Sequence, residues 1–167
     1  MSKRIVLLQA LAATPKDLEW IFKGAAASEF RRRPQPGAWS MADVVNHLAD
    51  VELRYLARLQ RIVAEERPFL PWMHPNEAAH DQSATLPELR ARFGEARAAT
   101  LAYLQALPPG SWQRPAMHET LGETKLRFMV QTLVNHDTEH LSQIVEIQQA
   151  LRAIPDLEPQ PAIPRGD

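Results

Sequence analysis

The stretch LRFMVQTLVNHDTEHLSQIVEIQQAL, residues 126–151, decides the fold, because its apolar residues recur with the period of an α-helix. At 100° per residue the apolar positions fall on one stripe: Leu126, Met129, Leu133, Ile144, Ile147 and Leu151. His136 and His140 occupy the same stripe, where aliphatic residues would otherwise stand. The pattern predicts a long amphipathic helix, from about 124 to 152, that turns two imidazoles toward the core.

Fourteen prolines divide the rest of the chain into further helical segments. Most of them lie in four clusters, at 34–36, 68–75, 108–115 and 155–164. Pro15 and Pro87 lie outside the clusters, where a helix could begin, and proline is tolerated in a first helical turn. The intervals predict three more helices, at about 3–28, 40–64 and 85–107. The first helix should break at Thr14-Pro15, which resembles a new helix start.

Two of these helices carry start signals. Ser40 is followed three residues later by Asp43, and Thr85 by Glu88. Both pairs resemble capping boxes, in which two side chains satisfy the free N–H groups of a first helical turn. We therefore expect the second and third helices to begin at these residues.

Four helices joined by long proline-rich connections predict an all-α fold of the four-helix bundle type. We expect one bundle domain over residues 1–154 and a proline-rich C-terminal tail over 155–167. A weak signal for extended structure is found at 111–123.

Composition narrows the classes of function. The formal net charge of −1 gives no electrostatic reason to expect nucleic acid as a partner. No apolar run approaches the roughly 20 residues that a membrane span needs, so we expect a cytoplasmic protein without a membrane partner. Because there are no cysteines, a metal would have to be held by His, Asp, Glu or water.

His136 and His140 are four residues apart, so on a helix they lie one turn above the other. Both imidazoles could then reach one ion. Two core histidines satisfied by hydrogen bonds, or an acid–base pair without metal, explain the same spacing. His47, at the edge of the apolar face of the second helix, offers a third nitrogen from a different element.

The stretches PGAWSMADVVNHLADVE (36–52) and NHDTEHLSQI (135–144) resemble the DinB-like superfamily of metal-binding four-helix bundles. The order of motifs agrees: Trp-Ser at a helix start, a histidine in that helix, and His-x-x-x-His in the last long helix. The resemblance covers about residues 5–152. It implies a metal triad of His47, His136 and His140 and a divalent ion, nickel or zinc before manganese or iron.

The resemblance also implies an activity on a small-molecule substrate. Members are described as metal-dependent hydrolases, or as transferases and isomerases that use a low-molecular-weight thiol. A non-catalytic metal-binding module would carry the same triad. Three neutral ligands leave coordination positions open, which is typical of a catalytic site.

Two carboxylates are candidates for catalysis. Asp50 lies one turn after His47, and Glu139 lies three residues after His136. Either could act as a general base, although metal-site histidines also use carboxylates to orient their second ring nitrogen. Asp137 is expected at the surface or between helices.

The other histidines and the first helix complete the expectations. His74, His80 and His118 are not expected as ligands, and Trp39 is expected as a core anchor. Apolar residues left over on the first helix make a homodimer plausible: Ile5, Leu8, Trp20 and Ile21.

Overall fold

The computed structural model describes residues 2–75 and 80–153, so the expected tail at 155–167 and the outer domain boundaries lie outside it. The described residues form four long helices: α1 (Lys3–Ile21), α2 (Met41–Ala64), α3 (Leu86–Ala106) and α4 (Leu126–Ala153). Short 3-10 turns, η1 (Ala27–Glu29) and η3 (Pro109–Gln113), lie in two of the connections. The predicted four-helix bundle is confirmed.

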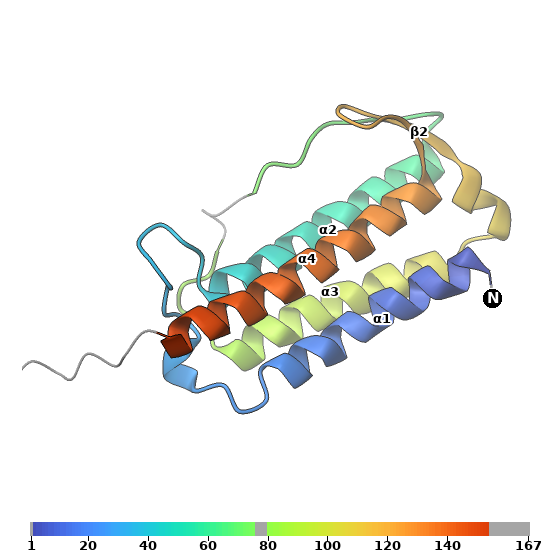
Figure 1. The fold of residues 1–167 in the computed structure, drawn as a ribbon. Helices are drawn as coiled ribbons and strands as arrows, with labels where there is room; N and C mark the ends of the chain where they lie inside the picture. Colours follow the sequence, from blue (N-terminus) through green and yellow to red (C-terminus); the bar gives the residue numbers. More distant parts are fainter. Residues whose placement is uncertain (1, 76–79, 154–167) are drawn as a thin grey trace, which may run out of the picture.

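The helices pack in a square (Figure 1). α2 lies beside α3 and α4, and α1 lies beside the same two helices, which places α1 and α2 diagonally opposite. α2 and α3 run in the same direction, because the connection between them returns the chain to the end where α2 began. α4 runs antiparallel to α2, and the two helices lie side by side.

A small sheet lies at one end of the bundle (Figure 1). It consists of β1 (Phe69–Leu70), β2 (Pro115–His118) and β3 (Gly122–Lys125), in that order. β1 pairs with β2 in parallel, and β2 pairs with β3 in antiparallel fashion. The extended signal at 111–123 is thus partly confirmed. β1 was not expected, because two residues are too few to show a periodicity.

Both predicted capping boxes are present. The Ser40 hydroxyl accepts from the Asp43 N–H at 3.2 Å, and the Asp43 carboxylate accepts from the Ser40 N–H at 2.9 Å. Thr85 and Glu88 form the same pair of bonds at the start of α3. α2 therefore begins at a defined residue, two turns before His47.

The predicted break in the first helix is wrong. α1 passes through Pro15 without interruption and ends at Ile21, earlier than the expected residue 28. Proline cannot donate to the carbonyl four residues back, which here is that of Leu11. Arg97 of α3 donates to the Leu11 carbonyl oxygen instead, at 2.9 Å from its Nη1. A contact between helices thus compensates for the missing helical hydrogen bond.

The core consists of two apolar clusters. One, around Leu11, Leu59 and Leu104, lies toward the sheet, and the other, around Leu18, Leu48 and Phe93, fills the opposite end. The six apolar stripe positions predicted for α4 are all buried. Between the clusters lie polar side chains from all four helices, and the histidines belong to this level.

The outer face of α1 keeps some apolar surface. Trp20 is 77% exposed and Ile5 is 46% exposed, whereas Leu8 and Ile21 are half-buried. The homodimer that these residues suggested stays a prediction.

Candidate metal centre

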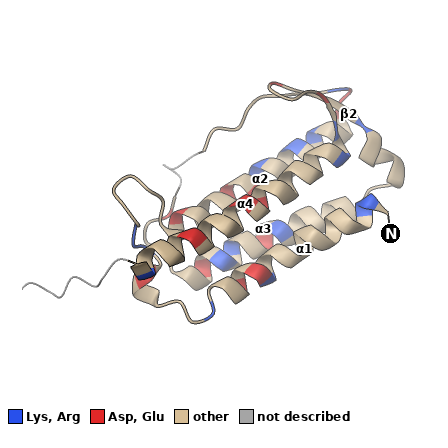
Figure 2. Ribbon diagram, in the orientation of Figure 1, with Lys and Arg blue, Asp and Glu red and all other residues tan. Residues whose placement is uncertain are grey.

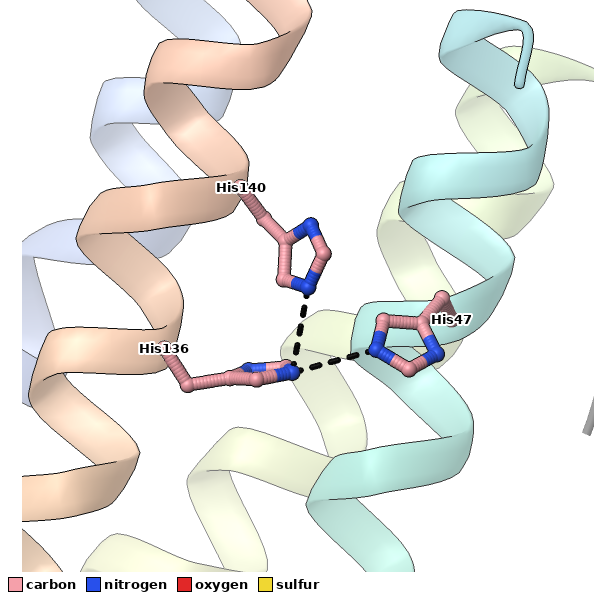
Figure 3. A group of neighbouring side chains, drawn as sticks. All are labelled: His47, His136 and His140. Atoms are coloured by element: carbon pink, nitrogen blue, oxygen red, sulfur yellow. Dashed lines mark hydrogen bonds between the residues drawn. The ribbon is translucent and has the colours of Figure 1, made fainter. Parts of the chain in front are cut away.

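The three histidines predicted as ligands come together between α2 and α4 (Figure 3). His47 comes from α2, and His136 and His140 come from successive turns of α4, with all three imidazoles turned toward one another. The Nε2 atom of His136 lies 3.1 Å from Nε2 of His47 and 3.1 Å from Nε2 of His140. The antiparallel packing of α2 on α4 creates this convergence.

These distances suit a shared ion better than hydrogen bonds. A neutral imidazole nitrogen offers either one N–H or one lone pair, so Nε2 of His136 cannot bond well to two ring nitrogens at once. Nitrogen ligands about 2.0–2.1 Å from one ion, at angles of about 90–110°, lie about 2.8–3.4 Å apart. The three residues therefore fit a divalent metal, and as a group they could hold one.

The Nδ1 atoms of the three histidines differ in their hydrogen bonding. Nδ1 of His140 lies 2.7 Å from Oε1 of Gln143, an acceptor, so the proton sits on Nδ1 and Nε2 stays free to coordinate. Nδ1 of His47 and of His136 are buried without a hydrogen-bond partner among the described residues. The imidazole of His140 is thus the one whose tautomer a neighbour selects.

Asp50 and Glu139 take different places around this centre. Oδ2 of Asp50 accepts from Nη1 of Arg54 at 2.9 Å, and the hydrogen bond from His47 to Asp50 is not formed. Glu139 is exposed and lines the pocket beside His136 and His140. Of the two carboxylates, Glu139 is therefore the better placed to exchange protons with a bound molecule.

Burial keeps the triad uncharged. It lowers the pKa of His47 to about 4, with the nearby His140 and His80 adding to the effect. Burial, followed by His140, His47 and Arg97, lowers the pKa of His136 to about 3. The pKa of His140 is lowered by burial as well. Neutral imidazoles are the form that binds metals, so protons compete little for this site at neutral pH.

Trp39 covers one side of the triad. Its ring centroid lies 5.0 Å from that of His47 and 6.1 Å from that of His140, on which it stacks at 15°. His80 packs edge-on against the same indole at 5.6 Å, and its Nδ1 lies 3.5 Å from Oδ1 of Asp43. Trp39 was expected as a core anchor, and its contact with the histidines was not expected, because nothing in its spacing from them indicates it.

A buried ionic cluster lies at the same level of the bundle. Arg97 of α3 donates to Glu52 of α2 at 2.7 and 2.9 Å and to Asp137 of α4 at 2.6 and 3.0 Å. Thr14 of α1 donates to Asp137 at 2.7 Å. Burial opposes the charge of Arg97, but the hydrogen bonds to Glu52 and Asp137 outweigh it and raise its pKa. Of the two positions expected for Asp137, the one between helices is found.

A pocket of about 450 Å³ opens onto the triad. It extends from Trp39 and the three histidines along α2 and α4 to Tyr55, Arg58 and His118. Its size is that of a small-molecule site. His118 lines its far end, whereas His74 and His80 do not line it; none of these three belongs to the group that could hold a metal.

The comparison of the sequence with known families decides the classification. The profile of the DinB superfamily matches residues 10–144. The chain belongs to the DinB superfamily. The triad of this DinB protein, His47, His136 and His140, lies within the region that the family profile matches. A search of curated proteins found no match.

Solved structures agree with this assignment at the level of the fold. The DinB chain is similar to YfiT from Bacillus subtilis, with 22% identity and a TM-score of 0.76 over 91% of this chain and 90% of that one. YfiT is described as a probable metal-dependent hydrolase with an unusual four-helix bundle topology. TT2238, a four-helix bundle protein, matches at 21% identity and a TM-score of 0.65, over 86% of this chain and 98% of its own.

A third similar structure is the DinB-like protein YjoA from Bacillus subtilis, at 12% identity and a TM-score of 0.60, over 89% of this chain and 93% of its own.

None of the described helices of this DinB protein is long and apolar enough to cross a membrane.

Proposed function

We propose that this DinB protein is a metal-dependent hydrolase of small molecules, with a divalent ion held by His47, His136 and His140. The observation that carries the proposal is the convergence of three Nε2 atoms, 3.1 Å apart in two pairs, at one end of a pocket of about 450 Å³. The description of YfiT as a probable metal-dependent hydrolase supports it. Nickel and zinc suit an all-imidazole ligand set.

Different residues would bind the metal, shield it from solvent and exchange protons with the substrate. A divalent ion supplies Lewis acidity, which polarises a carbonyl or phosphoryl oxygen and lowers the pKa of water. The three imidazoles hold it without adding charge, and Trp39 excludes solvent from one side of the rings. Glu139 is the residue we assign to proton exchange, because it lines the pocket and lies between His136 and His140 on α4.

The metal assignment is tested by measuring metal content after purification and after incubation with nickel or zinc. One ion per chain is expected for the wild type, and His136→Ala should lose it. His74→Ala is the matched control, since His74 is exposed and lies outside the triad. Equal occupancy in His136→Ala and wild type would refute these ligands.

The hydrolase assignment is tested with a panel of esters, amides and phosphoesters. Turnover should require metal and should fall by roughly 100-fold or more in Glu139→Gln, the range for loss of a general base, while the metal content stays unchanged. Product formation that needs an added thiol would assign the thiol-dependent transferase class instead. Full metal loading without any turnover would favour a non-catalytic binding module.

A further inference from the structure

The far end of the pocket holds a buried cation, Arg58, for which the described residues supply no counter-ion. Arg58 of α2 is 8% exposed, yet none of the described carboxylates lies within ion-pair distance of its guanidinium. Its guanidinium donates from Nη2 to the carbonyl oxygen of Pro71 and lies over the face of Tyr55, 6.0 Å from the ring centroid. Most of its five N–H donors therefore have no acceptor in the described chain.

This arrangement differs from the other buried arginine of the molecule. Arg97 is buried more deeply still, at 1% exposed, but two carboxylates neutralise it and raise its pKa despite burial. For Arg58, burial is the leading cause and lowers the pKa, with no carboxylate acting against it. Burying a charge without a partner is costly, and an anionic ligand would supply the missing opposite charge.

His118 adds an N–H donor to the same end of the pocket. Its Nδ1 accepts from the backbone N–H of Thr120 at 3.2 Å and of Leu121 at 3.4 Å. Burial, followed by the neighbouring Arg58, lowers its pKa and keeps the ring neutral. A neutral ring that accepts at Nδ1 carries its proton on Nε2, and this N–H has no partner among the described residues.

The charges of the pocket are opposite at its two ends. Glu139 is the carboxylate that lines the described pocket, and it lies at the histidine end. The acidic residues of α2 lie in its first half, whereas Arg54, Arg58 and Arg61 lie in its second half. Figure 2 shows basic segments at the end of α2 that lies toward the sheet. Near the far end, Glu65 is paired with Arg61, and Glu119 accepts from the Trp72 N–H at 2.6 Å.

We propose that Arg58 and His118 form a binding site for an oxyanion, a carboxylate or phosphate, at the end of a small-molecule substrate whose reacting bond lies at the triad. Eleven residues separate His47 from Arg58, about 16 Å along the helix axis, and the long arginine side chain shortens this span. Val51, Tyr55, Trp72 and Leu121 line the space between. The substrate is therefore an elongated molecule with an apolar middle and one anionic end.

The placing of the reacting bond rests on the proposed function, whereas the oxyanion site does not need the metal. The test accordingly uses metal-free protein and measures binding by titration calorimetry. The probes are 4-phenylbutyrate, its uncharged analogue 4-phenylbutyramide, and 3-phenylpropylphosphonate. The wild type should bind the acids roughly tenfold to hundredfold more tightly than the amide, the range for hydrogen bonds to a charged group. The tighter of the two acids identifies the anionic group.

Three variants locate the site. Arg58→Gln should bind acid and amide equally. Arg61→Gln removes one positive charge from an exposed position of the same helix and should keep the preference, as should His136→Ala, which lacks a triad residue. A failed metal assignment would leave these results unchanged. Equal binding of acid and amide to the wild type, or an acid preference that survives in Arg58→Gln, overturns the proposal.

Arg58 also contacts the carbonyl oxygen of Pro71, so a second variant covers the case in which Arg58→Gln does not fold. Arg58→Lys serves in that case, because it keeps the charge but loses the planar fork that matches an oxyanion with two bonds. The acid preference of Arg58→Lys should be several-fold smaller than that of the wild type. An unchanged preference would show that the arginine only anchors the 69–75 segment, and would overturn the proposal.

Discussion

At the scale of single residues, the triad is shaped by burial. Desolvation and mutual repulsion lower the pKa values of His47 and His136 to about 4 and about 3, from an ordinary value of 6.5. In the unfolded chain the same side chains bind protons at pH 6.5 and below. The folded metal-free protein therefore binds fewer protons than the unfolded chain, and acid favours unfolding.

We predict that the metal-free protein is most stable above about pH 6.5 and loses stability as the pH falls toward 4. Each unit of pKa shift corresponds to about 1.4 kcal/mol at most, so the two histidines together contribute a loss of a few kcal/mol. Urea unfolding at pH 7, 6 and 5 measures it. His136→Leu should show a shallower dependence on pH, because a leucine takes up no proton; parallel curves for the two proteins would contradict the assignment.

At the scale of helices, one side chain of α3 joins the other three. Arg97 donates to Leu11 of α1, Glu52 of α2 and Asp137 of α4. It thereby satisfies the carbonyl that Pro15 leaves without a donor, which is why α1 continues where its sequence predicts a break. Local sequence rules cannot reveal this, since the compensating donor lies 86 positions from Leu11 in the chain.

We predict that Arg97→Met destabilises the protein by about 3–5 kcal/mol, because it leaves Glu52 and Asp137 buried without a counter-charge. Urea unfolding at neutral pH measures the change. Arg90→Met is the matched control, because Arg90 lies two turns earlier on α3. Its ion pair with the exposed Glu19, at 3.6 Å, lies at the surface and is worth at most about 1 kcal/mol. Similar losses of unfolding free energy in the two variants would show that the ionic cluster around Arg97 stabilises the protein no more than a surface ion pair does.

At the scale of the whole molecule, much of the fold follows from patterns of short range. Helical periodicity, proline clusters and two capping boxes are local properties, so they predicted α2, α3 and α4 to within two residues. The small sheet depends on pairing between residues 69–70 and 117–118, which no local pattern carries. The parallel course of α2 and α3 likewise depends on how a connection crosses the bundle.

The candidate site shows the same division. The spacing of His136 and His140 predicted two neighbouring imidazoles, whereas His47 was added through its resemblance to a family motif. Trp39 reaches the pocket from the loop before α2, Arg58 from α2 and His118 from the sheet. Their convergence could therefore be seen only in the three-dimensional structure. The place of Asp50 one turn after His47 suggested a role beside that histidine, but its carboxylate pairs with Arg54 instead.

The triad also links metal binding to the stability of the whole fold. Its ligands come from α2 and α4, which are separate in the unfolded chain, so an ion that binds all three holds only the folded form. At a free metal concentration 100 times Kd, this adds about 2.7 kcal/mol to the free energy of unfolding. For a chain of this length, the melting temperature should rise by about 5–10 °C.

Thermal unfolding with and without nickel or zinc measures this shift, and chelation should reverse it. His140→Ala should abolish most of it, because the two remaining ligands come from different helices and bind an ion weakly. Arg58→Gln should keep the full shift, since its effect is confined to the oxyanion end of the pocket. A rise of equal size in His140→Ala would mean that the stabilising ion binds elsewhere, and the triad would then be a cluster of buried histidines and not a metal centre.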